Sequence, residues 1–171
     1  MEIVLIVMLI LAGIGNGISA LTAGADSTTA VEILWIGNDI LLLFGLIGIL
    51  LILNKHLNVL AKLSLLLAIS GVAFMAGPSA SIAGISAYSI AAPVVAISLL
   101  AFTLSQINTR HYRKAYLVIA TGLLISIVNA PFGLWPVALI GRILFSVGLI
   151  LLGQRLIRTQ LSGHPLPNQP V

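Results

Sequence analysis

The chain has 171 residues, of which 60% are hydrophobic and only 7% are charged, and its mean hydropathy is +1.20. A soluble domain carries about 25% charged residues, so this composition excludes an ordinary soluble protein and indicates an integral membrane protein. The net charge of +4 does not predict nucleic-acid binding, because seven of the eight basic residues lie in or beside gaps between apolar runs. The chain has no cysteine, which excludes disulfides, thiolate metal sites and lipid anchors on cysteine.

Six apolar runs reach or approach the length of about 20 residues that a membrane-spanning helix needs. They cover residues 3–23, 31–53, 57–76, 82–105, 112–129 and 136–153. Pro78 and Pro131 fall in gaps between runs, and Pro136 suits the first turn of a helix. We therefore predict an all-α membrane protein, a compact bundle of six transmembrane helices with short loops. It forms one domain over residues 1–158, and the proline-containing residues 159–171 form a disordered cytoplasmic tail.

Basic residues predict the orientation of this bundle. Lys and Arg flank the gaps after the second and fourth runs and the end of the sixth run, whereas the other three gaps contain none. The positive-inside rule then places both termini in the cytoplasm of a multi-pass protein of the cell membrane, plasma or bacterial inner. A signal peptide remains an alternative, because residues 23–25 have the small-x-small pattern of a cleavage site, although Glu2 precedes the first apolar run without any Lys or Arg. Cleavage leaves five helices in the same orientation.

Two ionisable residues lie well inside apolar runs, Asp39 in the second and Arg142 in the sixth. A charge near the bilayer centre costs about 2.5 to 3.5 kcal/mol or more, so each charge needs compensation. Counted from the outer surface, both residues lie roughly 9 to 12 Å deep at a rise of 1.5 Å per residue. We therefore predict an ion pair between the second and sixth helices. The competing interpretation is that Arg142 extends toward the outer surface and Asp39 is protonated.

Other polar residues reach the same depth in their helices, namely Asn16, Ser70 and Tyr88, and Asn38 adjoins Asp39. We predict a polar cluster in the outer third of the bundle that is formed by Asn16, Asp39, Tyr88 and Arg142, with Asn38 as a further member. Each Asn or Tyr taken alone is more typical of contacts between helices or of the membrane interface than of a binding site. The two charges are what make the set a candidate binding site.

The fourth run combines small residues at four-residue spacing, from Ser79 to Ala92, with Pro93, which removes a helical hydrogen bond. This pattern predicts close helix packing and a kink in mid-membrane, either a static kink or a hinge. Gly13 and Gly17 form another pair of small residues in the first run. Such faces also suit a second copy of the chain or a membrane partner.

Chemical motifs are absent from the sequence. All three histidines lie outside the apolar runs, and no metal-site, nucleophile, phosphate-loop or paired-acid motif is present, so we expect no metal and no cofactor. Three classes of function remain. The first is a small transporter or permease that binds a solute or proton around Asp39 and Arg142; the second is an accessory subunit in which these charges only fix helix packing. An enzyme acting on lipid is the least favoured class, because no catalytic arrangement is visible.

Overall fold

The computed structural model describes residues 1–22, 29–76, 81–82 and 85–161. These residues form six helices and one short antiparallel pair of strands, and nearly all of the regular structure is helical. The elements in chain order are α1 (Glu2–Leu21), α2 (Thr29–Leu53), α3 (Val59–Met75), β1 (Ser81–Ile82), β2 (Ile85–Ser86), α4 (Ala87–Ser105), α5 (Arg113–Asn129) and α6 (Trp135–Leu161).

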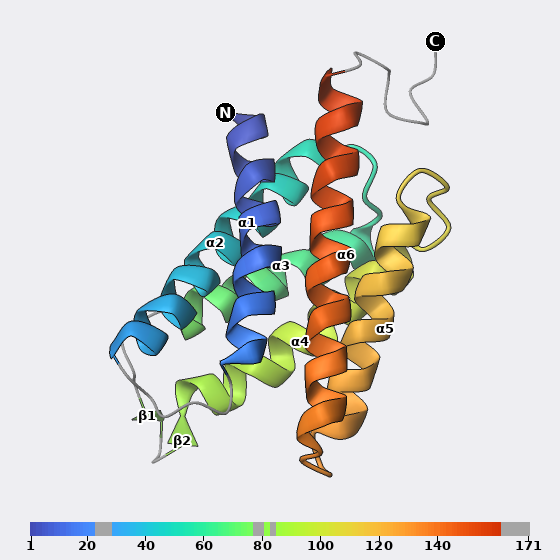
Figure 1. Cartoon of the computed structure of the whole chain (residues 1–171). Helices are drawn as coiled ribbons and strands as arrows, with labels where there is room; N and C mark the ends of the chain where they lie inside the picture. The colour runs from blue at the N-terminus through green and yellow to red at the C-terminus, as the bar shows by residue number, and fades with distance from the viewer. Residues whose placement is uncertain (23–28, 77–80, 83–84, 162–171) are drawn as a thin grey trace.

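The six helices pack in a closed ring that follows the chain order (Figure 1). Each helix contacts the helix before it and the helix after it, and α6 returns to pack against α1. The N-terminus, the α2–α3 and α4–α5 connections and the C-terminal end of α6 lie at one end of the ring. We call this the basic end, because Lys55, Arg110, Arg155 and Arg158 belong to these segments.

Four of the described helices are long and apolar enough to cross a membrane, judged by length and composition. They are α1, α2, α4 and α6. The remaining two, α3 and α5, have 17 residues each, the lower limit of about 17 for a spanning helix. Large apolar side chains cover the outside of the ring, for example Val59, Ile97 and Val128. An apolar exterior of this kind suits a hydrocarbon environment rather than water.

The predicted start of the fourth helix is wrong, because α4 begins at Ala87 and not at residue 82. Ser86 ends the extended segment: its hydroxyl accepts a hydrogen bond from the Ser89 amide (3.2 Å), as an N-cap does. Ser81 pairs with Ser86 in the two-residue strands that precede it. Residues 77–80 and 83–84, which carry much of the predicted small-residue pattern, lie outside the described residues. Pro93 is therefore the seventh residue of α4.

The sixth helix is longer than predicted and continues past Gly153 to Leu161. Gly153 lies within the helix and allows close contact with α1, since a Cβ there would lie 2.5 Å from Cγ1 of Ile10. Beyond it, Leu156 and Thr159 remain buried, and the Thr159 hydroxyl donates to the Arg155 carbonyl (2.9 Å). The predicted tail is thus helical over residues 159–161, and residues 162–171 lie outside the described residues.

The apolar core contains residues of all six helices and extends from Leu57 and Leu156 near the basic end to Val72 and Val95 farther along the ring. Its aromatic centre is Tyr116, which makes edge contacts with Phe102 (5.7 Å between ring centroids) and Tyr112 (6.1 Å). Aliphatic side chains from the other helices pack around these rings: Ile6, Leu9, Leu46, Ile49, Leu65, Leu152 and Leu156. These residues come from the N-terminal parts of α1, α3 and α5 and the C-terminal parts of α2, α4 and α6. Alternating helix directions therefore bring them to the same end.

Candidate functional site

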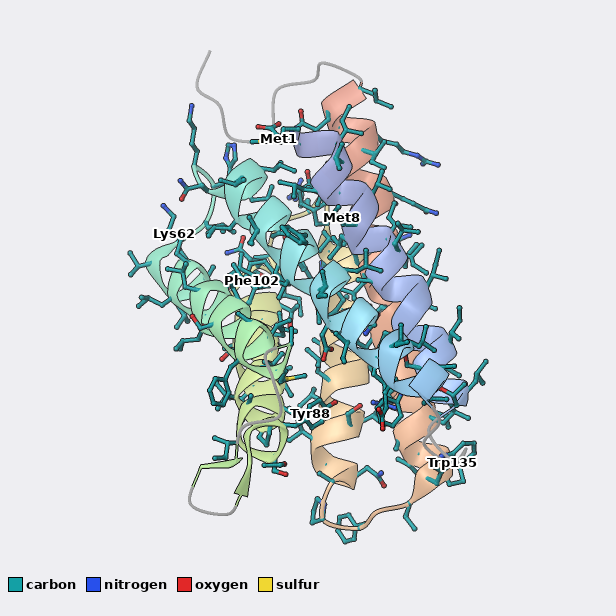
Figure 2. The ribbon with its side chains drawn as sticks, turned by 90° about the vertical axis from the view of Figure 1, so that its left-hand side faces the viewer. Met1, Met8, Lys62, Tyr88, Phe102 and Trp135 are labelled. Carbon is teal, nitrogen blue, oxygen red and sulfur yellow. The ribbon has the colours of Figure 1, made fainter. Side chains whose placement is uncertain are left out.

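A cavity of about 390 Å³ opens among α1, α2, α4 and α6 at the end of the ring opposite the basic end. We call this end the cavity end. Figure 2 places Tyr88 and Trp135 toward it, and Met1 and Lys62 toward the basic end. The structure brings all five sequence-predicted site residues together in this cavity, along with two more. The lining consists of Asn16, Ser19, Trp35, Asn38, Asp39, Tyr88 and Arg142.

Helical spacing explains how each segment presents its side chains. On α2, Trp35, Asn38 and Asp39 occupy positions i, i+3 and i+4, which share one face of a helix. On α1, Asn16 and Ser19 are three residues apart and share a face in the same way. The sequence analysis missed Ser19, although its spacing from Asn16 could have identified it.

Tyr88 and Arg142 complete the lining from the other side of the ring. Tyr88 is the second residue of α4 and lines the cavity. The N-cap at Ser86 sets the start of this helix and therefore the position of Tyr88. Its side chain is 52% exposed. Arg142 lies seven residues into α6. Ser70, which the sequence places at a similar depth on α3, is not among the lining residues.

Hydrogen bonds attach α1 to α6 beside the cavity. The Asn16 amide nitrogen donates to the Ser146 hydroxyl (2.9 Å) and to the Arg142 carbonyl (3.4 Å). The Ser146 hydroxyl in turn donates to the same carbonyl (2.8 Å). Gly17 faces Ser146 and Gly13 faces Ile150, so the small pair on α1 serves contact with α6 within the chain. These bonds use the Arg142 carbonyl and not its guanidinium, and Arg142 also lines the cavity.

Two lining residues carry buried polar atoms without a hydrogen-bond partner in the described structure, Oγ of Ser19 and Oδ1 of Asn38. Asn38 is only 8% exposed, and its Oδ1 packs against Gly15, where a Cβ would lie 2.7 Å away. A buried polar atom that lacks a partner costs about 1 to 3 kcal/mol. Most such groups in proteins are paired, and both of these unpaired atoms belong to residues of the cavity lining.

Asp39 and Arg142 line the same cavity but do not form the predicted ion pair. Among the described residues, no carboxylate oxygen of Asp39 lies within 4.0 Å of an Arg142 nitrogen. The order of the helices in the ring explains why the two charged groups do not meet, because α2 and α6 both pack on α1 and not on each other. The two charges are nevertheless close enough to interact electrostatically with each other and with Tyr88.

A second cavity of about 350 Å³ lies along α5 and α6 near their connection. Its lining is apolar apart from Asn129, and the Asn129 amide already donates to the Leu134 carbonyl (3.0 Å). This cavity offers no charge and no convergent polar groups. Within the described residues, no group of three His, Asp or Glu side chains is arranged to hold a metal ion.

Comparison with known proteins adds no assignment to this geometry. No protein-family model, no curated protein and no solved structure matches the chain. The interpretation of the cavity therefore depends on its own residues.

Proposed function

We propose that the protein spans the membrane with all six helices. Support comes from the closed ring, in which α3 and α5 are full partners of the four longer helices. Aromatic residues near the cavity end, Trp35, Phe132 and Trp135, are partly exposed, as is typical of a membrane interface. The basic end carries Lys and Arg in the α2–α3 and α4–α5 connections and at the end of α6. By the positive-inside rule, this distribution supports cytoplasmic termini and an outward-facing cavity end.

We propose further that the protein is a small transporter or permease that binds a polar solute in the cavity. The observation that carries this proposal is the cavity lining: opposite charges from α2 and α6 and polar groups from α1 and α4 converge on one space without filling it. Ionisable residues inside membrane helices are functional by default, because burying them is costly. Transporter sites are typically formed in this way, by several helices around a polar pocket within the membrane.

The competing function is an accessory subunit in which Asp39 and Arg142 only fix helix packing. That role predicts direct contacts made by the two charged groups. The bonds that join α1 to α6 instead use the Arg142 carbonyl, the Asn16 amide and the Ser146 hydroxyl. Packing of these helices therefore does not require the guanidinium, and the cavity lining favours solute binding.

Site-specific cysteine labelling tests this proposal, and the chain is suited to it because it contains no cysteine. Trp35→Cys and Tyr88→Cys, two cavity-lining positions with exposed side chains, are each made in the full chain and exposed to a membrane-impermeant methanethiosulfonate in sealed vesicles of either orientation. We expect both variants to react from the side of the cavity end. Lack of reaction at both positions in folded protein indicates a dry bundle and overturns the transporter proposal in favour of the accessory subunit.

Two control variants calibrate this experiment. Leu46→Cys lies in the packed core, where the side chain is 1% exposed, and should not react from either side. Asn54→Cys lies in the exposed α2–α3 connection and should react only from the side of the basic end. Reaction of Asn54→Cys and Tyr88→Cys from the same side contradicts the proposed orientation.

A further inference from the structure

The cavity presents one acidic and one basic side chain to the same space, and this pairing constrains what it binds. Among the described lining residues, Asp39 is the one acid and Arg142 the one base. Opposite charges at this depth gain most by direct contact, yet the two groups are not in ionic contact. They are held apart because α1 lies between their helices and is fastened to α6 by Asn16.

From this arrangement we infer that the solute is a small zwitterion, whose cationic group binds Asp39 and whose anionic group binds Arg142. The inference rests on the proposed function. A solute with one charge satisfies one of these side chains and is repelled by the other. A solute with both charges satisfies both, and carries no net charge into a low-dielectric site where net charge is penalised.

The remaining lining residues fit the same class of solute. Trp35 and Tyr88 supply aromatic rings, which attract ammonium groups through their faces. Ser19 and Asn38 also line the cavity, but their unpartnered oxygens are covered by neighbouring protein atoms and are assigned no contact with the solute. The Asn16 amide nitrogen is already engaged with α6 and is therefore a positioning group. Arg142 is then the donor for the anionic group, and its planar guanidinium suits a carboxylate.

Cavity size restricts the zwitterion to a small molecule. The volume of about 390 Å³ lies toward the lower end of the roughly 300 to 1,000 Å³ that is typical of ligand sites. It corresponds to roughly a dozen water molecules at about 30 Å³ each. Free amino acids with neutral side chains and betaines fall in this range, whereas peptides and lipids are too large to be enclosed.

The test uses three matched probe sets on the full chain in lipid nanodiscs. The zwitterions are the amino acids with neutral side chains and glycine betaine, the cations are the corresponding amino acid amides, and the anions are the corresponding N-acetyl amino acids. Binding is measured as slower methanethiosulfonate labelling of Trp35→Cys and, in the unmodified chain, as a higher unfolding temperature. We expect at least one zwitterion to bind at least about tenfold more tightly than its amide and its N-acetyl derivative.

Charge-neutralising variants distinguish a binding role of Asp39 and Arg142 from a merely structural role. Asp39→Asn should weaken binding of the zwitterion about tenfold or more and strengthen binding of the N-acetyl derivative, because the repelling carboxylate is gone. Arg142→Gln should weaken the zwitterion and strengthen the amide. Glu32→Gln on α2 and Arg155→Gln on α6 remove the same charges from the same helices outside the cavity, and should leave all three affinities unchanged.

The outcomes separate this inference from the proposed function. If Trp35→Cys reacts but only amides, only N-acetyl derivatives or none of the probes slow its labelling, the zwitterion class is wrong and the solvated cavity stands. If neither Trp35→Cys nor Tyr88→Cys reacts in folded protein, the proposed function is wrong and the inference fails with it. Protection of Trp35→Cys in the otherwise unmodified chain decides the question even where a charge-neutralised variant does not fold.

Discussion

The two ends of the ring are formed by the same six helices but are filled in opposite ways. At the basic end, aromatic and branched side chains close the centre around Tyr116. At the cavity end, seven side chains of α1, α2, α4 and α6, most of them polar or charged, surround about 390 Å³ of space. Helices in lipid associate mainly through packing, because lipid tails are as apolar as leucine. Close packing of apolar side chains therefore fills the basic end, whereas the mostly polar side chains of the cavity end surround open space.

Two glycines on α2 provide the sharpest probe of this comparison. Gly45 lies in the packed half, where a Cβ would be 2.8 Å from the Leu9 backbone Cα on α1. Gly37 lies near the cavity end, where nothing is within 4 Å of the Cβ position. The same added methyl group therefore separates helices at one end and meets open space at the other.

The largest expected effect comes from Gly45→Ala. Because backbone atoms of Leu9 cannot move aside without shifting α1, we expect the free energy of unfolding to fall by about 1 to 3 kcal/mol. Gly37→Ala should leave it unchanged or raise it by up to about 1 kcal/mol, since alanine favours helix. Reversible unfolding in lipid–detergent bicelles measures both. Equal losses in the two variants contradict the difference in packing between the ends.

A second test reduces the polar character of the cavity end. Asn38→Leu replaces a buried side chain whose Oδ1 has no partner with an apolar one of similar shape, so we expect the protein to become more stable by about 1 to 2 kcal/mol. Thr103→Val is the matched control in the packed half, where the hydroxyl donates to the Leu100 carbonyl (2.9 Å). It should lower stability by about 0.5 kcal/mol. Zwitterion binding should weaken in Asn38→Leu and stay constant in Thr103→Val.

If Asn38→Leu is less stable than the parent in the same bicelles, the Asn38 amide makes a structural contribution. The polar lining of the cavity end then does not lower the stability of the protein in exchange for binding. Stability gained together with weaker binding is the expected pattern for a functional site.

Sequence alone predicted a chain of apolar helices and five of the seven residues that line the cavity, but not how these residues meet. Each of the six apolar runs contains one helix, although the ends of several helices differ from the ends of the runs. Counting depth along helices then collects Asn16, Asn38, Asp39, Tyr88 and Arg142 into one cavity. The direct ion pair could not be excluded from sequence, because depth says nothing about which helices are neighbours. Only the ring shows that α1 separates α2 from α6.

The helix boundaries that the sequence missed have local causes. Gly153 resembles a helix end, yet its missing side chain allows the Ile10 contact, which only the packed structure reveals. The start of α4 at Ala87 depends on the Ser86 hydroxyl accepting from the Ser89 amide, one of several serines in that stretch that could have served as the cap. Apolar composition alone does not distinguish these possibilities.

A smaller effect is expected within the packed end itself. The Tyr116 hydroxyl is buried among apolar side chains and has no hydrogen-bond partner in the described structure. Tyr116→Phe keeps the ring and its edge contact with Phe102, so unfolding should become less favourable by about 1 kcal/mol. The bicelle measurement above checks this. A loss of stability indicates that the hydroxyl has a partner in the membrane, such as a buried water.

The smallest effect on stability is expected at Tyr112, whose aromatic ring contacts that of Tyr116. The two residues compare a hydroxyl that has a hydrogen-bond partner with one that has none in the described structure. The Tyr112 hydroxyl donates to the Thr159 hydroxyl over 3.4 Å, a long hydrogen bond that joins the start of α5 to the end of α6. Tyr112→Phe should therefore lower the free energy of unfolding by about 0.5 kcal/mol, the average for such bonds in membranes. Tyr116→Phe is its matched control and should change stability in the opposite direction. If both variants shift stability in the same direction, the Tyr112 and Tyr116 hydroxyls are equivalent, and the packing of the basic end depends on the aromatic rings alone.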